Sequence, residues 1–175
     1  MPIPFREAEH IFSAPKVLLK PMAWSDVANG HRQVCLTAPV ALNEGAVPRG
    51  VLFRCYAYPA HLSVFTFQLD CERYEMRRRI ELYRLEVCPF RPHTNKCYGP
   101  DEINGRYFAP EETHEHDFHD SLTEAGDLRV NSCEQARPIE RPPTDFATAC
   151  DVFCRRINIV NGDEIPPPPA QGQLF

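Results

Sequence analysis

The chain has 175 residues, of which 43% are apolar, and a formal net charge of −5 at pH 7. This length suits one domain with a sizeable core and is short for two. The acidic balance argues against indiscriminate binding to nucleic acid, which needs a basic field. The 18 prolines against 8 glycines predict stiff turns and extended segments. We expect one domain over residues 1–160 and a proline-rich tail over 161–175.

The N-terminus and the cysteines predict a cytoplasmic protein. The first ten residues lack the basic and apolar regions of a secretory signal. No stretch approaches about 18 consecutive apolar residues, so we expect no contact with a membrane. Because the chain is large enough to fold without disulfide bonds, most of its eight cysteines are interpreted as reduced thiols.

The first half of the chain predicts a short helix followed by strands. Residues 5–12 favour the helix. Apolar and polar residues alternate over 33–40, which indicates a strand. β-Forming residues at 51–58, a Pro-Ala turn and strict alternation over 61–70 predict a β-hairpin. With a further strand at 78–88, these segments predict an antiparallel meander.

The strand at 78–88 has an irregular pattern. Tyr83, Leu85 and Val87 share one face, whereas Ile80 and Leu82 are out of phase with them. Either both faces of this strand are partly covered, or a β-bulge lies near Tyr83.

The second half predicts a long irregular loop and a terminal helix. Residues 89–143 carry seven prolines and little periodicity, and loops of this length are usually functional or disordered. Thr144 is the expected N-cap of an amphipathic helix over 145–156. The predicted fold is therefore α+β: an antiparallel sheet of four or more strands, with the C-terminal helix packed on one face.

Histidines concentrate in the long loop. His114 and His116 stand two positions apart, so on a strand both side chains would point to the same side. His93 or His119 can add a third ligand. Three protein ligands with an open position are the arrangement of catalytic zinc sites. The cofactor expected here is a divalent transition metal such as zinc, with His93, His114 and His116 as ligands.

The same residues permit two other interpretations. A pair of imidazoles can cleave a phosphodiester without metal, one accepting a proton while the other donates one. Thr94 or Asn95 would then orient a phosphate or an attacking hydroxyl. The segment can also be a solvated, acidic, histidine-rich loop without any site.

Two further motifs involve cysteine and serine. Cys88 and Cys97 flank His93 and could join His114 or His116 in a structural zinc site, although their spacing is not that of a zinc knuckle. The tripeptides His61-Leu62-Ser63 and His119-Asp120-Ser121 match the paired motifs of two-histidine phosphoesterases only weakly.

Charge is unevenly distributed along the chain. Six arginines lie between residues 73 and 91, and nine acidic residues lie between 101 and 127. Arg77 and Arg79 share a strand face and, with Arg84, are candidates for phosphate binding. Alternatively, this basic strand is a solvated edge, or it pairs with the acidic segment that follows it.

Several of these features also occur together in a known family. A hairpin precedes Pro92-His93-Thr94-Asn95, then Ile103-Asn104-Gly105, a His-x-His pair and a C-terminal helix. This order resembles an uncharacterised family of small bacterial and phage proteins described as toxin components of toxin–antitoxin systems. The resemblance covers roughly residues 50–160. It implies that His93, Asn95, His114 and His116 converge, and that the protein is a cytoplasmic nuclease or related hydrolase.

The leading hypothesis is a small cytosolic hydrolase of RNA or a nucleotide. His93, His114 and His116 would carry the chemistry with Asn95, and Arg77, Arg79 and Arg84 would bind phosphate. The alternative is a non-catalytic protein-binding module, such as a phage- or defence-encoded inhibitor. It would contact its partner through the acidic segment 101–127 and mask a basic site there.

Overall fold

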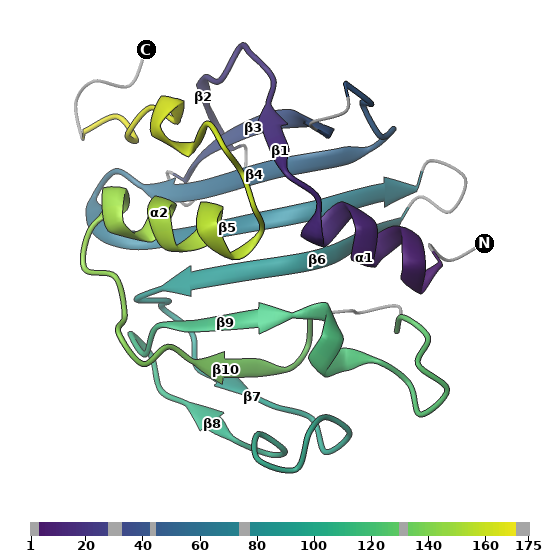
Figure 1. Cartoon of the computed structure of the whole chain (residues 1–175). Coiled ribbons are helices and arrows are strands. Elements are labelled where there is room, and N and C mark those ends of the chain that lie inside the picture. The colour runs from purple at the N-terminus through teal and green to yellow at the C-terminus, as the bar shows by residue number, and fades with distance from the viewer. Residues whose placement is uncertain (1–3, 28–32, 43–44, 74–77, 130–132, 171–175) are drawn as a thin grey trace.

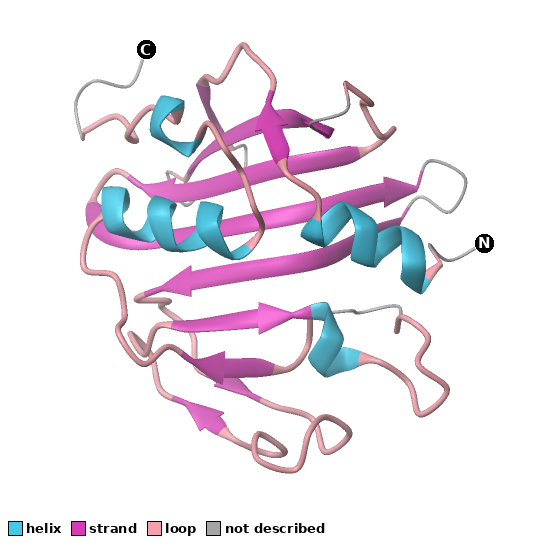
Figure 2. Ribbon diagram, in the orientation of Figure 1, coloured by secondary structure: helices cyan, strands magenta, loops and turns pink. Residues whose placement is uncertain are grey.

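The computed structural model describes residues 4–27, 33–42, 45–73, 78–129 and 133–170. Its long strands form one twisted sheet with two helices in front of it (Figures 1 and 2). The helices are α1 (Phe5–Ser13) and α2 (Phe146–Arg156), with short 3-10 turns η2 (Phe118–Ser121) and η3 (Gly162–Glu164). The strands are β1 (Lys16–Leu18), β2 (Trp24–Asp26), β3 (Val34–Leu42), β4 (Val51–Tyr58), β5 (His61–Arg73), β6 (Arg78–Val87), β7 (His93–Thr94), β8 (Tyr107–Phe108), β9 (His114–Asp117) and β10 (Ala136–Pro138).

The predicted α+β fold and antiparallel meander are confirmed. The sheet has eight strands in the order β1-β3-β4-β5-β6-β9-β10, with β2 also paired to β3. Strands β7 and β8 form a separate hairpin. The segment predicted as a long irregular loop is more ordered than expected, because β9 extends the meander by pairing with β6 and β10 pairs with β9.

Aromatic side chains hold both helices against the same face of the sheet. The ring of Phe153 on α2 lies 5.4 Å from that of Tyr83 and 5.5 Å from that of Phe67. Phe12 of α1 contacts the same Tyr83 at 6.1 Å. Burial of such large apolar side chains supplies most of the free energy that fixes helices on a sheet. No helix of the described residues covers the opposite face of β5, β6 and β9 (Figures 1 and 2).

The irregular pattern of β6 comes from a β-bulge. Leu69 of β5 pairs with Tyr83, but the next residue, Asp70, pairs with Glu81. Leu82 is therefore the extra residue, and the bulge brings Ile80 back into phase with Tyr83 on the helix-covered face. Of the two explanations that the sequence allows for this strand, the bulge near Tyr83 is confirmed.

The ends of the C-terminal segment differ from the prediction. Asp145, not Thr144, is the N-cap of α2: its side chain accepts a hydrogen bond from the Thr148 backbone N–H at 2.8 Å. The expected tail over 161–175 begins inside the fold. Ile165 is buried, and the Trp24 indole donates a hydrogen bond to the Pro166 carbonyl oxygen at 3.0 Å. In the described residues, no helix is long and apolar enough to cross a membrane.

Candidate metal centre

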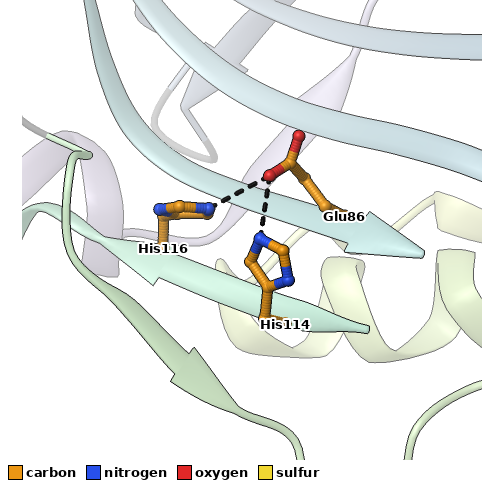
Figure 3. Close-up of side chains that lie close together, drawn as sticks. All are labelled: Glu86, His114 and His116. Atoms are coloured by element: carbon orange, nitrogen blue, oxygen red, sulfur yellow. Dashed lines mark hydrogen bonds and ion pairs between the residues drawn. The ribbon is translucent and has the colours of Figure 1, made fainter. Parts of the chain in front are cut away.

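Three side chains from β6 and β9 converge on the helix-free face of the sheet (Figure 3). Glu86 pairs with His114 across the two strands, and Arg84 pairs with His116. The Oε2 atom of Glu86 lies 3.0 Å from Nε2 of His114 and 3.2 Å from Nε2 of His116. One ligand atom from each of Glu86, His114 and His116 lies within 4.8 Å of the other two. The common direction of the two histidines, expected from strand alternation, is confirmed.

The hydrogen bonds of His114 determine which of its nitrogens can bind a cation. Its Nδ1 atom lies 2.7 Å from the backbone carbonyl oxygen of Glu112, which only accepts hydrogen bonds. Nδ1 therefore carries a proton. Nε2 faces the Glu86 carboxylate: it donates a hydrogen bond when it carries a proton, and it can share a cation with the carboxylate when it does not. Two acceptors at 3.0 Å repel each other unless a proton or a cation lies between them.

Burial and neighbouring charges determine the ionisation of His116 and Glu86. Burial, and then the adjacent Arg84 guanidinium, lower the pKa of His116 to about 3, so this ring is neutral near pH 7. Burial alone would raise the pKa of Glu86, but hydrogen bonds from His114 and His116 and the charge of Arg84 bring it well below its usual range. Glu86 is therefore ionised beside two fully buried imidazoles.

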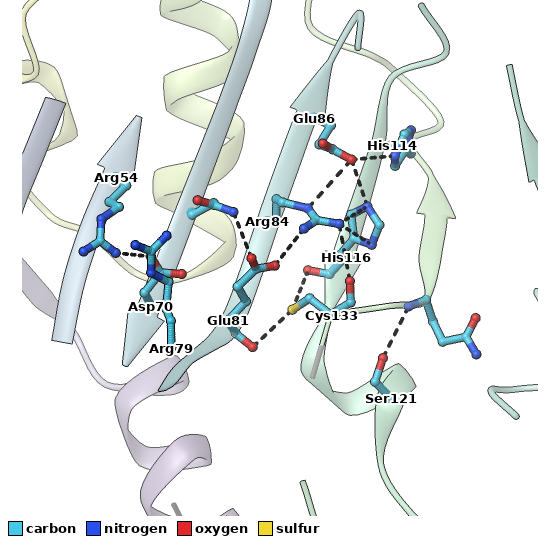
Figure 4. Close-up of polar contacts among 12 residues, drawn as sticks. Arg54, Asp70, Arg79, Glu81, Arg84, Glu86, His114, His116, Ser121 and Cys133 are labelled. Carbon is cyan, nitrogen blue, oxygen red and sulfur yellow. Dashed lines mark hydrogen bonds and ion pairs between the residues drawn. The ribbon is translucent and has the colours of Figure 1, made fainter. Parts of the chain in front are cut away.

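Arg84 lies beside the centre, between Glu81 and the Glu86–His116 pair (Figure 4). Its Nη1 atom lies 2.8 Å from Glu81 Oε2, and its Nε lies 3.7 Å from Glu86 Oε2. Its Nη2 atom lies 3.1 Å from Nε2 of His116. Two carboxylates thus surround the Arg84 guanidinium.

His93 stands next to the three ligands and is held by Asn95. Its ring centre lies 4.9 Å from that of His116 and 5.6 Å from that of His114. Its Nε2 donates a hydrogen bond to Asn95 Oδ1 at 2.9 Å, since that oxygen also accepts from the backbone N–H of Ala136 at 2.7 Å. Burial lowers the pKa of His93, and the bond to Asn95 offsets this only in part. The neutral ring keeps Nδ1 free to accept a proton.

The structure therefore brings together four residues predicted from the sequence: His93, Asn95, His114 and His116. In the described part of the chain, the three side chains grouped closely enough to hold a metal are Glu86, His114 and His116. His93, the predicted third ligand, is a neighbour of that group, and Glu86 takes its place. Glu86 was missed because a charged residue within a strand usually marks a solvated face. Its position opposite the histidine strand depends on the pairing of β6 with β9.

The predicted phosphate-binding arginines have other environments. The Arg84 guanidinium is held by two carboxylates, and Arg79 forms an ion pair with Asp70 at 3.5 Å on the same face of the sheet. Arg77 lies outside the described residues. Arg91, from the same arginine-rich run, was not singled out as a site residue. It lines a pocket that also reaches Glu86 and His93.

That pocket opens beside the candidate centre. Its volume is about 720 Å³, within the range typical of small-molecule sites. Its lining includes Glu86 and His93 from the centre, together with Tyr58, His61, Phe90 and Arg91. A ligand in this pocket would therefore reach the exposed edge of the Glu86 carboxylate, while His114 and His116 stay buried behind it.

Two other combinations, which the sequence supports only weakly, do not form in the described residues. His61 lies in the pocket, whereas His119 contacts Phe12 and Glu9 of α1, so the paired phosphoesterase motif does not converge. The structural zinc site is also not formed, because the group that could hold a metal in the described residues contains neither Cys88 nor Cys97.

Residues of the acidic segment have hydrogen-bond partners within the molecule. Asp117 accepts a hydrogen bond from Arg156 at 2.6 Å, and Asp120 accepts one from Arg137 at the same distance. Glu115 accepts one from the Tyr83 hydroxyl at 2.5 Å. The arginine partners come from α2 and β10, which follow the acidic segment in sequence.

We compared the chain with family models, curated proteins and solved structures. None of the three comparisons finds a match. The site must therefore be interpreted from its own geometry and chemistry.

Proposed function

We propose that this protein is a metal-dependent hydrolase of a phosphoester, with RNA or a nucleotide as substrate. The observation that carries the proposal is the convergence of Glu86 Oε2 with the Nε2 atoms of His114 and His116 at 3.0 and 3.2 Å. Two histidines and one glutamate form the ligand set of a major class of catalytic zinc sites, which keep a further position open.

The chain's own residues have distinct roles in this proposal. His114 is held in its ligating tautomer by the Glu112 carbonyl oxygen, and Glu86 supplies the negative charge. A zinc ion bound here would polarise a phosphoryl oxygen and acidify a bound water. His93, held by Asn95, would accept a proton through Nδ1 at the side of the pocket.

The pocket supports an anionic, nucleotide-sized substrate. Arg91 is exposed in its lining and forms no hydrogen bond or ion pair with the described residues. An arginine without an acidic partner is suited to a phosphate, because its planar guanidinium can make paired hydrogen bonds. The alternative protein-binding module has less support, since Glu115, Asp117 and Asp120 of the acidic segment already have intramolecular partners.

Hydrolysis assays on single-stranded RNA and on model phosphodiesters test the proposal. We expect activity that is lost with a chelator and restored by Zn²⁺ or another divalent transition metal. Replacements Glu86→Gln and His114→Asn should each lower kcat/KM at least 100-fold. His10→Gln, which changes an exposed histidine on α1, is the matched control.

The two competing hypotheses predict different results. Activity that survives chelation but is lost on substitution of His93 or His116 would favour the metal-free pathway and reject a role for a metal in hydrolysis. Absence of hydrolysis by the metal-loaded protein would reject the proposal that the protein is a hydrolase. If the protein acts as a toxin, the same substitutions should also relieve the growth arrest that follows its expression.

A further inference from the structure

An exposed aromatic side chain stands at the pocket beside the candidate metal centre. Phe90 follows β6 and is 47% exposed. The rings of Tyr58 and His61 pack against it edge-on, with centres 5.0 and 4.9 Å away. Tyr58 and His61 flank the turn between β4 and β5, so both are carried by the rigid hairpin. Phe90 is therefore fixed in place although almost half of its surface faces solvent.

A cation stands directly beside this ring. Arg91 is exposed, lines the same pocket and makes no hydrogen bond or ion pair with the described part of the chain. Pro89 and Pro92 flank Phe90 and Arg91 in the sequence. The ring of each proline fixes its own backbone φ, so the backbone of this segment has less conformational freedom to lose on binding.

The aromatic and metal-binding groups share one pocket. Phe90, Arg91, Glu86 and His93 all line it. A molecule whose phosphate reaches Glu86 and His93 can therefore extend to Phe90 without leaving the pocket. The other end of that molecule would meet an aromatic surface, and a flat, π-bonded group is what such a surface binds best.

We propose that Phe90, supported by Tyr58 and His61, stacks against an unpaired nucleobase, and that Arg91 binds the adjoining phosphate. The substrate class is thus a mononucleotide or single-stranded nucleic acid, because a base inside a duplex cannot reach the ring. This inference rests on the proposed function for the orientation of the phosphate. It gives His61, singled out in the sequence, a supporting position in the base subsite.

Equilibrium binding of small phosphates tests the inference without turnover. Adenosine 5′-monophosphate, ribose 5-phosphate and inorganic phosphate are titrated by calorimetry into the full chain. Stacking of one base is worth about tenfold in affinity. We therefore expect the base-bearing ligand to bind about tenfold more tightly than ribose 5-phosphate, and Phe90→Ala to abolish that difference. Phe90→Leu, which keeps most of the apolar volume, should abolish it too, whereas Phe90→Trp should preserve it.

Tyr107→Ala and Arg141→Gln change residues outside the pocket and serve as controls. Tyr107→Ala removes another exposed aromatic side chain, one that does not line the pocket. Arg91→Gln should weaken all the phosphate ligands about equally, whereas Arg141→Gln, which changes another exposed arginine, should have no effect. Circular dichroism confirms that each variant is folded.

The possible results separate this inference from the proposed function. Equal affinity for adenosine 5′-monophosphate and ribose 5-phosphate, binding of neither, or an unchanged preference in Phe90→Ala would overturn the base subsite. Base-dependent binding without hydrolysis of any substrate would reject the enzyme alone and leave the subsite standing. Hydrolysis with no preference for a base-bearing substrate would overturn the base subsite and leave the proposed enzyme activity standing.

Discussion

Asn95 holds His93 by a hydrogen bond of 2.9 Å between Oδ1 and the imidazole Nε2. The amide is fixed in turn, because its Nδ2 donates to the carbonyl oxygens of Ile103 and Ala136 at 2.8 and 2.9 Å. Asn95 is 3% exposed. It is therefore a positioning residue that links the β7–β8 hairpin to β10 and determines the tautomer of His93.

Replacement of Asn95 should lower the stability of the fold. Asn95→Ala leaves two carbonyl oxygens and the Ala136 N–H without their partner, so we expect a loss of about 2–3 kcal/mol of unfolding free energy. Urea denaturation measures it. Thr94→Ala, at the exposed neighbouring position, should stay within about 0.5 kcal/mol. A loss no larger in Asn95→Ala than in Thr94→Ala would show that the amide is dispensable.

Lys16 joins the C-terminal ends of both helices. It is fully buried, and its ammonium group donates to the carbonyl oxygens of Phe12, Ala14 and Ile157 at 2.7, 2.6 and 2.5 Å. Lys16→Met keeps the unbranched, flexible shape of the side chain but leaves these acceptors unpaired in the core. We expect this substitution to cost about 3 kcal/mol or more in thermal or urea denaturation.

The matched control for this prediction is Lys20→Met. Lys20 forms an ion pair with Glu164 in which its own side chain is 69% exposed. Such surface pairs contribute about 0–1 kcal/mol. If the two substitutions had equal effects, burial of the Lys16 ammonium would not matter to the fold.

His119 makes the stability of the protein depend on pH. Its Nδ1 and Nε2 atoms lie 2.5 Å from Asp117 and Glu9 oxygens, respectively, and these contacts join η2 to α1. The hydrogen bond with Asp117, together with the nearby carboxylates, raises the pKa of His119 above 6.5 in the folded state. The protonated ring is thus favoured by folding, so its contribution is complete below pH 6.5 and is lost as pH rises through the folded pKa.

Chemical denaturation at pH 6 and pH 9 tests this linkage. We expect His119→Gln to lower the unfolding free energy at pH 6 by more than it does at pH 9. His10→Gln, which changes an exposed imidazole on α1, is the matched control. An equal effect of His119→Gln at the two pH values would contradict the linkage.

The parts of the fold that were predicted correctly are those with a local signal. The hairpin of β4 and β5 was predicted because alternation along 61–70 is strict. The bulge in β6 was one of two explanations allowed by the phase break between Leu82 and Tyr83. Helix α2 was predicted from helical spacing, with an error of one residue at its N-cap. In each case the pattern lies within a few consecutive residues.

The parts that were missed depend on contacts between distant segments. Strand β9 has only four residues, and it exists because it pairs with β6 and β10 on its two sides. Glu86 joins the histidines only through that pairing. Lys16 has no flanking residues that distinguish a buried lysine from an exposed one. The common face of His114 and His116 was predictable, but the identity of the third ligand was not.

The central claim is that Glu86, His114 and His116 bind a transition metal, and elemental analysis tests it most directly. The full chain is loaded with Zn²⁺, freed of excess metal by dialysis and analysed beside Glu86→Gln, His114→Asn and the His10→Gln control. We predict one zinc per chain in the wild type and control, with a higher Tm when zinc is present, and loss of both in the two ligand variants. Wild-type protein that retains no zinc, or ligand variants that keep one equivalent, would contradict the assignment.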